Sequence, residues 1–309
     1  MGTVHIPKVM RDNVLMYYGD RGLDWIDRLP AVISEVARQW SLQVLEPYPN
    51  PSINFVAPVI KRDGSEAVLK LGVPGREISA EIAALSRFGG EGAVILLESD
   101  PALGMLLLEK LTPGTPLFED SDTPLAVEIA GGVMKALWKA PPEEHSFPTV
   151  GEWFSGLAKV RSRFDGGTGP FPSRIFERAE ALSREMLDSA PAAMLLHGDC
   201  HHHNILSSSG RGWLAIDPKG VVGDPVFELC AYLRNPRDLH ERFDVAKTLP
   251  GRVHRFAEIL GLELKRIASW GLAESILSAS WSLDGDPAFV RNSVELAELY
   301  GKMLREQTI

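Results

Sequence analysis

The hydrophobic positions of the first part of the chain recur every three or four residues between residues 20 and 46. This spacing predicts an amphipathic helix with one apolar stripe. Five residues form the stripe: Trp25, Leu29, Val32, Val36 and Trp40. Pro30 interrupts the pattern. Because proline lacks a backbone N–H and suits the first turn of a helix, we expect a helix to begin there.

The pattern then changes to one that is typical of strands. Phe55–Ile60 and Glu66–Leu71 read as two strands, and the turn "KRDGS" between them contains Asp63-Gly64, a hairpin signal. Residues 76–89 return to helical spacing and end at a glycine, which favours a helix stop. The segments "GAVILLESD" and "GMLLLEKL" predict a second pair of strands.

A Pro/Gly break, "TPGTPL" at Thr112–Leu117, follows these strands and is our candidate boundary. Beyond it the pattern is mainly helical, with two short strands predicted in "MLLHGD" and "GWLAIDP". The tail from residue 244 to residue 309 reads as nearly all helix, with Trp270, Leu277 and Trp281 on one face. We expect both of these tryptophans to be core residues, and an aromatic floor beneath a sugar or a guanidinium group is the alternative.

Composition narrows the classes of function. The 309 residues suffice for one large domain or two lobes, and two cysteines are too few for a disulfide framework. The N-terminus lacks the features of a signal peptide, and no apolar run has the length of a membrane span, so we expect a cytoplasmic protein that does not bind membranes. The net charge of −9 disfavours nucleic acid and suits a cationic or neutral small ligand, although acidic surfaces commonly serve solubility alone.

The stretch "LLHGDCHHHNIL" concentrates the candidate chemistry. A zinc site is one hypothesis for it. However, His201, His202 and His203 are consecutive, so their side chains alternate sides in an extended segment and splay apart in a helix. We therefore favour a second hypothesis in which the aspartate and the asparagine carry the chemistry.

Those polar residues have the spacing of a phosphoryl-transfer loop. His197-x-Asp199-x-x-x-x-Asn204, followed by Asp217 after "WLAI", matches the order His-Arg-Asp-x-x-x-x-Asn and a later metal-binding aspartate in protein kinases. The first aspartate orients the attacking hydroxyl, while the carboxamide and the later carboxylate supply oxygen ligands for Mg²⁺. His197 is expected to be structural.

This hypothesis requires a lysine on an earlier strand and an acidic partner on the next helix. "EAVLKLG" places Lys70 on the second hairpin strand. Glu81 lies on the following helix, and Glu77, one turn earlier, is the competing partner. Such a Lys–Glu pair holds the ammonium group against nucleotide phosphates.

The residues as a set resemble the aminoglycoside phosphotransferase family. "HGDCHHHNIL" is similar to the family's HGD-x-H-x-x-N loop, and "IDPKGVVGDPVFEL" to its metal-binding segment. "EAVLKLGVPGREISAEIAAL", "GAVILLE" and "LLLEKLTPGTPL" look most like the streptomycin 6-kinase and hydroxyurea phosphotransferase branch. The likeness extends from about Leu42 to Asn235.

The resemblance implies a role for each matching residue. Asp199 would be the catalytic base or orienting group, Asn204 and Asp217 would bind magnesium, Lys70 would hold ATP phosphates, and Glu81 would position Lys70. The backbone carbonyl of Glu109 and the backbone N–H of Leu111 would meet adenine. His201 would hold the loop by hydrogen bonds.

The sequence departs from the kinase pattern at two places. "YPNPSINF" stands where a glycine-rich phosphate loop would lie, so Ser52 and Asn54 are the candidate phosphate contacts there. Pro218-Lys219 replaces the Phe-Gly that follows the metal-binding aspartate of protein kinases. Both departures resemble the antibiotic-kinase branch.

We expect several other residues to have structural roles, not catalytic or binding ones. We expect Cys200 and Cys230 to be small core residues. Asp224 is expected to cap a turn before Pro225, with substrate binding as the alternative. Glu274, Asp284 and Asp286 are expected to be solvated charges, with contact to a cationic substrate as the alternative.

Together these observations predict an α+β, two-lobed protein-kinase-like fold. Residues 1–111 would form the nucleotide-binding lobe with a helical extension, and residues 112–309 the mainly helical lobe with the catalytic loop. The expected reaction moves the γ-phosphoryl group of ATP, with Mg²⁺, to a hydroxyl of a small cationic or polyhydroxylated molecule such as streptomycin. A different acceptor, such as hydroxyurea, and a nucleotide-binding module without turnover are the alternatives.

Overall fold

The chain divides into two compact units, residues 1–114 and residues 115–309. The computed structural model describes residues 6–49, 52–120, 123–236, 239–242 and 244–306. The division falls inside the predicted Pro/Gly break. Among the described residues, no helix combines the length and the apolar character that crossing a membrane would require.

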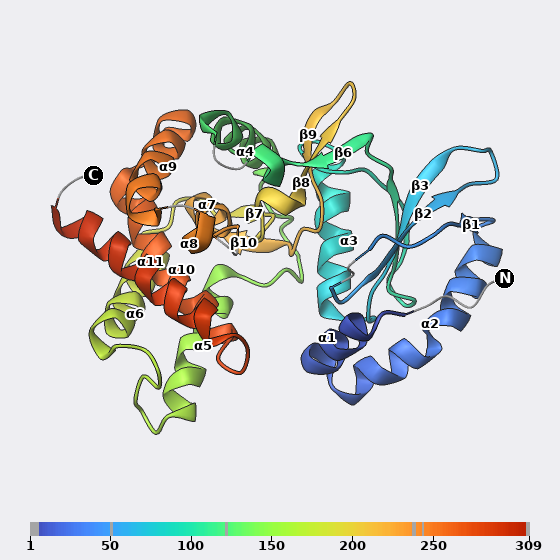
Figure 1. The fold of residues 1–309 in the computed structure, drawn as a ribbon. Helices are drawn as coiled ribbons and strands as arrows, with labels where there is room; N and C mark the ends of the chain where they lie inside the picture. Colours follow the sequence, from blue (N-terminus) through green and yellow to red (C-terminus); the bar gives the residue numbers. More distant parts are fainter. Residues whose placement is uncertain (1–5, 50–51, 121–122, 237–238, 243, 307–309) are drawn as a thin grey trace. The chain divides into compact units, whose positions relative to one another are not determined.

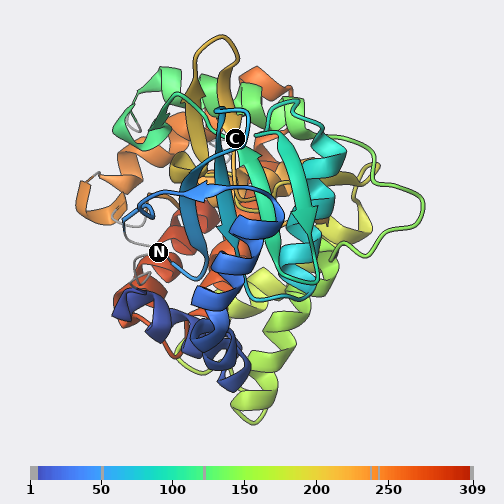
Figure 2. The ribbon, with the colours of Figure 1, turned by 90° about the vertical axis from the view of Figure 1, so that its right-hand side faces the viewer.

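Unit 1 contains an antiparallel sheet with the strand order β1-β2-β3-β5-β4 (Figure 2). Its strands are β1 (Gln43–Val44), β2 (Phe55–Ile60), β3 (Glu66–Leu71), β4 (Leu96–Asp100) and β5 (Met105–Glu109). The predicted hairpin is confirmed with the predicted bounds, and its register pairs Phe55 with Leu71 and Ile60 with Glu66. The side chain of Asp63 accepts hydrogen bonds from Ser65 and so closes the turn.

Two helices, α1 (Lys8–Tyr18) and α2 (Asp20–Gln39), precede the sheet. The expectation that a helix begins at Pro30 is wrong, because α2 runs through that residue. Burial of one side of the helix explains this: Leu29, Ile33 and Val36 are buried in a core shared with the sheet, and that burial offsets the backbone hydrogen bond that proline removes.

The two faces of this sheet are covered by different helices. Figures 1 and 2 show α2 on one face and α3 (Arg76–Phe88) on the other. Leu69 and Leu71 belong to the core beneath α1 and α2. Because side chains alternate along a strand, Lys70 points to the opposite face, toward α3. The α3 helix ends at Gly89, as predicted, with a left-handed backbone.

Unit 2 contains short strands among helices. β7 (Met194–Leu196) pairs with β10 (Val221–Gly223), and β8 (Ile205–Ser208) pairs with β9 (Gly212–Ala215). β6 (Pro113–Pro116) lies next to β8 in the sheet order and spans the point where the units divide. The two strands predicted in this half are therefore present as β7 and β9.

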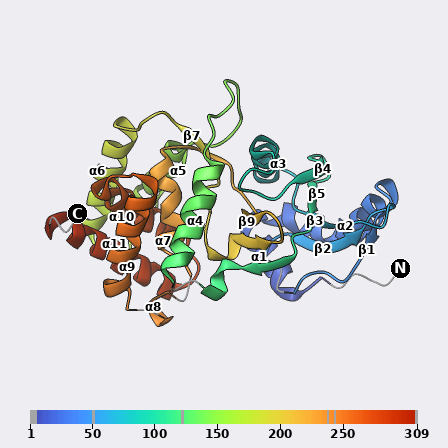
Figure 3. The same ribbon diagram turned by 90° about the horizontal axis from the view of Figure 1, so that it is seen from above.

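Helices form the rest of unit 2, with α10 (Leu264–Trp281) at their centre (Figure 3). Among the described elements, it packs against the turn Pro225–Glu228 and against α5 (Val150–Arg163), α6 (Ser173–Asp188), α7 (Leu229–Leu233), α9 (Val245–Leu260) and α11 (Pro287–Glu306). α4 (Pro124–Leu137) packs on α9, and α8 (Leu239–Arg242) is a short helix between α7 and α9. The described part of unit 2 also contains three short 3-10 turns, η1 (Leu117–Asp120), η2 (His202–Asn204) and η3 (Pro225–Glu228).

The predicted apolar face of the tail is correct for Trp270 and Leu277, which are fully buried. Placing Trp281 in the core is wrong, because its side chain is 52% exposed. It is the last residue of α10, eleven residues beyond the buried Trp270.

Candidate active site

The predicted site residues of unit 1 centre on a buried ion pair. Nζ of Lys70 lies 2.6 Å from Oε1 of Glu81, and both residues are buried. Glu77, the competing partner, instead accepts a hydrogen bond from the hydroxyl of Tyr18 at 2.7 Å. Glu81 therefore holds the ammonium group of Lys70 at a fixed place on the α3 face of the sheet, an arrangement that suits contact with a phosphate oxygen.

The other nucleotide candidates of unit 1 lie just before β2 and at the end of β5. The side-chain amide of Asn54 covers Gly72 so closely that a Cβ on that glycine would lie 2.6 Å from Oδ1 of Asn54. Ser52 is exposed, and its carbonyl accepts a hydrogen bond from Asn13. The carboxylate of Glu109 accepts one from the N–H of Ile95. Binding of phosphate or adenine by these residues stays a prediction.

Leu111 lies two residues after Glu109, the last residue of β5. Within the part of the chain that the structure describes, its backbone N–H has no hydrogen-bond acceptor. A peptide N–H that lacks an acceptor in the protein suits a ligand with a hydrogen-bond acceptor, such as a purine ring. The expected adenine contact thus fits this position and stays a prediction.

In unit 2, the catalytic-loop candidates follow β7. Gly198 has a φ of +81°, and a Cβ there would lie 2.8 Å from Val221 and 3.0 Å from Trp153, so both conformation and space require glycine. Asp199 comes next. Nδ2 of Asn204 donates to the carbonyl of Asp199 at 3.0 Å, which turns the carboxamide oxygen of Asn204 away from that bond.

Asp217 is fixed against the same loop by backbone hydrogen bonds on both sides. The N–H of Ile216 donates to the carbonyl of Asn204, and the N–H of Lys219 donates to the carbonyl of His197. Asp217 itself has a φ of +61°, an unfavourable conformation for a residue other than glycine, which is typical of functional sites. The structure therefore gathers Asp199, Asn204 and Asp217 into one region of unit 2.

His197 links the two segments as a neutral ring. Its Nδ1 accepts the backbone N–H of Asp199 at 3.2 Å, so Nε2, 2.7 Å from the carbonyl of Ile216, must carry the proton. Burial lowers the pKa of His197 to about 4, which keeps the ring neutral at physiological pH. The expectation of a structural role for His197 agrees with these contacts.

Glu228 holds the catalytic loop through hydrogen bonds to its backbone. It was not predicted as a site residue from the sequence. Its two carboxylate oxygens accept the backbone N–H groups of His197 and Gly198 at 2.7 and 2.9 Å. Burial raises the pKa of Glu228 to about 7, although both hydrogen bonds act in the opposite direction. The only signal in the sequence was its position in "GDPVFEL", which does not show that its partners are backbone groups.

Arg234 was also missed, and it lies between two acidic residues. Its Nε is 2.9 Å from Glu274, and its Nη2 is 3.4 Å from Oδ1 of Asp199. Burial acts to raise the pKa of Asp199, but the charges of His201 and Arg234 outweigh it and lower that pKa. Nothing in the local pattern around Arg234 indicates this contact, since Glu274 lies forty residues away on α10.

The three consecutive histidines have three different surroundings. His201 accepts the backbone N–H of His203 through Nδ1, so it holds the loop as expected. His202 is buried and stacks on Tyr232, whereas His203 stacks on Phe118. In the described ranges, no three His, Cys, Asp or Glu side chains are arranged to hold a metal ion.

The remaining acidic candidates have partners within the protein. Asp224 caps the next turn through the N–H of Val226, as expected, and its other oxygen accepts from Arg266 and Trp270. Glu274 is buried against Arg234, so it is not a free acidic contact for a cationic substrate. Asp284 pairs with Arg163, and Asp286 accepts from the N–H of Ala288.

Magnesium fits the oxygen atoms at this site better than zinc would. Asn204 and Asp217 offer a carboxamide oxygen and a carboxylate, which are hard oxygen ligands. Magnesium is typically bound by one or two protein carboxylates together with substrate phosphates, so a full cage of protein ligands is not required. The donor set is therefore compatible with a metal–nucleotide complex.

Comparison with known proteins identifies the family of the chain. The profile of the family described as aminoglycoside/hydroxyurea antibiotic resistance kinase matches residues 40–285. A streptomycin 6-kinase of Streptomyces glaucescens is 30% identical over 298 residues, covering 96% of each chain. A hydroxyurea phosphotransferase of Kitasatospora aureofaciens is 33% identical over 303 residues, covering 96% of this chain and 86% of its own.

Solved structures share the fold. An aminoglycoside phosphotransferase in a ternary complex with ADP and hygromycin B has a TM-score of 0.62 at 12% identity, over 88% of this chain and 97% of its own. At such low identity the likeness establishes the predicted kinase-like fold and nothing more. The family profile covers well over half of the chain, and therefore this protein belongs to the aminoglycoside/hydroxyurea antibiotic resistance kinase family.

Proposed function

We propose that this protein transfers the γ-phosphoryl group of ATP, with Mg²⁺, to a hydroxyl of a small molecule, and that streptomycin is the leading acceptor. The observation that carries the proposal is the gathering of Asp199, Asn204 and Asp217 around one loop of unit 2. The similarity to streptomycin 6-kinase over nearly the full length of both chains supports the acceptor.

In this proposal each residue has one task. Asp199 accepts a hydrogen bond from the acceptor hydroxyl and aligns its oxygen for in-line attack. Its low pKa keeps it ionised, so it is able to receive the proton as the new bond forms. Lys70, held by Glu81, places a positive charge on the phosphates of the nucleotide.

Asn204 and Asp217 would hold the metal through their side-chain oxygens. When bound, Mg²⁺ neutralises the negative charge of the phosphates. The backbone of Leu111 and the carbonyl of Glu109 would contact adenine, and Ser52 and Asn54 would contact phosphate. Expression in the cytoplasm, where ATP is available, is consistent with two buried thiols.

Hydroxyurea is the second candidate acceptor, because a hydroxyurea phosphotransferase is 33% identical to this chain. A binding module without turnover is disfavoured, since the lysine, the glutamate and the three polar residues of the loop are all present.

The test is ATP consumption with purified protein, MgATP and either streptomycin or hydroxyurea. We expect ADP release that depends on streptomycin, and a product heavier by one phosphoryl group in mass spectrometry. Turnover with hydroxyurea alone would reassign the acceptor. ATP binding without acceptor-dependent turnover, across a broad panel of hydroxyl compounds, would contradict the enzymatic proposal.

A further inference from the structure

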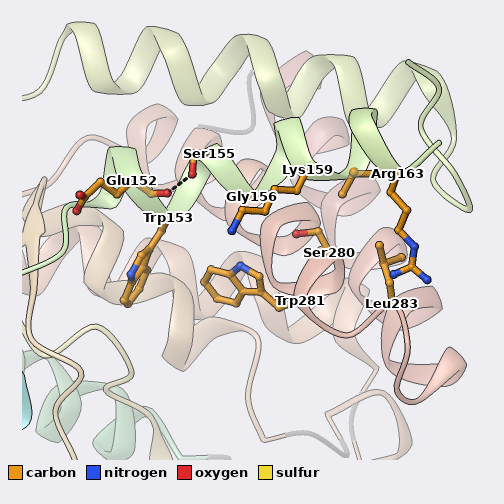
Figure 4. Close-up of a pocket in the computed structure, with 10 residues that line it drawn as sticks. Glu152, Trp153, Ser155, Gly156, Lys159, Arg163, Ser280, Trp281 and Leu283 are labelled. Atoms are coloured by element: carbon orange, nitrogen blue, oxygen red, sulfur yellow. Dashed lines mark hydrogen bonds between the residues drawn. The ribbon is translucent and has the colours of Figure 1, made fainter. Parts of the chain in front are cut away.

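A cavity of about 360 Å³ lies in unit 2 between α5 and the C-terminal end of α10 (Figure 4). Its α5 side includes Glu152, Trp153 and Lys159, and its α10 side includes Ser280 and Trp281. All of these residues belong to one unit, so the cavity is defined without reference to the rest of the chain.

Two tryptophans form the apolar wall of the cavity. Their ring centroids are 5.6 Å apart with an angle of 89° between the planes, so the edge of one indole meets the face of the other. Trp153 is half-buried, and Trp281 is 52% exposed. The indole of Trp281 also lies close to the backbone of α5, since a Cβ on Gly156 would be 3.4 Å from its Nε1. Trp281 therefore packs against α5 and keeps about half of its side chain accessible to a ligand.

This wall touches the catalytic loop. A Cβ on Gly198 would lie 3.0 Å from Cη2 of Trp153, so the indole edge rests against the residue that precedes Asp199. A ligand that contacts Trp281 is therefore about one indole width from the loop. A molecule with two or three linked rings is long enough to span that separation, whereas a single small group is not.

The charged side chains around the cavity determine whether it suits a cation or a neutral, hydroxyl-bearing group. Arg163 is already paired with Asp284 through two hydrogen bonds, and Glu152 accepts the backbone N–H of Thr149 as part of a helix cap. Lys159 has no hydrogen-bond or ion-pair partner among the residues that the structure describes. An unpaired ammonium group beside Trp281 repels a second cation and donates hydrogen bonds to hydroxyl oxygens.

We propose that this cavity is a subsite for a sugar ring of a multi-ring acceptor, carried by the part of the molecule that is not phosphorylated. The C–H face of the ring packs on the indole of Trp281, and its hydroxyls accept hydrogen bonds from Lys159. The inference rests on the proposed function, because it places the remainder of an acceptor whose reacting hydroxyl lies at Asp199. It identifies Trp281 and Lys159 as residues that determine acceptor size.

The test measures binding by titration calorimetry with two probes, streptomycin and streptidine, its guanidinium-bearing ring without the sugars. Trp281→Ala should weaken streptomycin binding about tenfold, because it removes one aromatic packing surface, and should change streptidine binding by less than about twofold. Trp213→Ala is the matched control, since Trp213 is a half-buried tryptophan of β9 outside the cavity. It should alter neither affinity.

Lys159→Met separates a sugar subsite from a cation subsite. The sugar subsite predicts weaker streptomycin binding, whereas a site for a guanidinium group predicts tighter binding once the positive charge is gone. Equal affinity of Trp281→Ala and the wild type for streptomycin would overturn the subsite and leave the proposed reaction standing. Failure of the wild type to bind streptomycin at all would overturn the acceptor assignment and the subsite together.

Discussion

Lys70 in unit 1 is expected to contact nucleotide phosphates and Asp199 in unit 2 the acceptor hydroxyl, and the protein holds these two charged side chains differently. Lys70 is 2% exposed and forms a 2.6 Å ion pair with Glu81. The side chain of Asp199 is 25% exposed, and its oxygen lies 3.4 Å from Arg234 and 3.7 Å from His201. The ammonium group of Lys70 is thus fixed by a short ion pair, whereas the two ion pairs of the Asp199 carboxylate are longer.

The difference is explained by what each group has to do. A lysine that binds phosphate needs one fixed direction, and a buried ion pair supplies it. A carboxylate that receives a hydroxyl proton must keep an oxygen accessible. Its position is set through the backbone instead, because Glu228 holds the N–H groups of His197 and Gly198, and Asn204 holds the carbonyl of Asp199.

The largest expected effect comes from removing the accessible carboxylate. Asp199→Asn should lower kcat by about 10²–10⁴-fold, because the amide cannot accept the proton. The affinity for MgATP, measured by calorimetry, should change by less than about threefold. A variant that retained wild-type turnover would remove Asp199 from its assigned role.

Breaking the ion pair between Lys70 and Glu81 should lower activity less than Asp199→Asn does, and should lower the free energy of unfolding more. Lys70→Met should lower kcat/KM by about 10²-fold through misplaced phosphates, and should cost about 3–5 kcal/mol of unfolding free energy, because the buried carboxylate of Glu81 loses the ammonium group that it pairs with. The double variant Lys70→Met, Glu81→Gln should recover most of the stability and none of the activity. Denaturant unfolding and initial rates measure the two effects. Recovery of activity in the double variant would contradict the role of Lys70.

Glu228→Gln tests whether the backbone support matters. The glutamine amide accepts only one of the two N–H groups, so we expect a loss of about 1–3 kcal/mol in stability and a smaller kcat with little change in KM for ATP. A Glu228→Gln variant as active and stable as the wild type would show that the backbone contacts of Glu228 do not hold Asp199 in position.

The pH dependence of stability sharpens the same test. The pKa of Glu228 is raised from 4.5 to about 7, so the folded state holds that proton more tightly and this group's contribution to stability falls as pH rises between those values. The pKa of His197 is lowered from 6.5 to about 4, so its contribution is lost as pH falls through that window. The two effects oppose each other in the wild type. Glu228→Gln should therefore show a steeper rise in melting temperature between pH 4 and 6.5, and an unchanged profile would contradict the buried carboxylate as its cause.

The smallest effect is expected at Arg234. Arg234→Lys keeps a positive charge but cannot contact Glu274 and Asp199 with one planar group. Weaker attraction should raise the pKa of Asp199 and move the acidic limb of the kcat profile to higher pH, with a loss of about threefold at the optimum. A purely structural role for Arg234 would lower stability and leave the shape of the pH profile unchanged.

Local patterns were sufficient for much of the fold. The hairpin of β2 and β3 was predicted with its bounds because alternating residues and the Asp63-Gly64 turn both act within a few positions. The end of α3 at Gly89 was predicted for the same reason. Pro30 misled the prediction because its cost is local, whereas the burial of the α2 stripe that offsets it depends on a sheet later in the chain.

The sequence by itself determined the order and spacing of the chemical groups: a strand lysine, a helix glutamate, and the Asp-x-x-x-x-Asn loop with a later aspartate. Phosphoryl transfer requires these groups in this order, so their spacing along the chain can be recognised without a structure. Only the tertiary structure decided that Glu81 and not Glu77 meets Lys70, that Glu228 and Arg234 support Asp199, and that Trp281 faces a cavity. Each of these outcomes depends on which distant side chain or backbone group lies opposite, and burial and packing across helices and strands set that pairing.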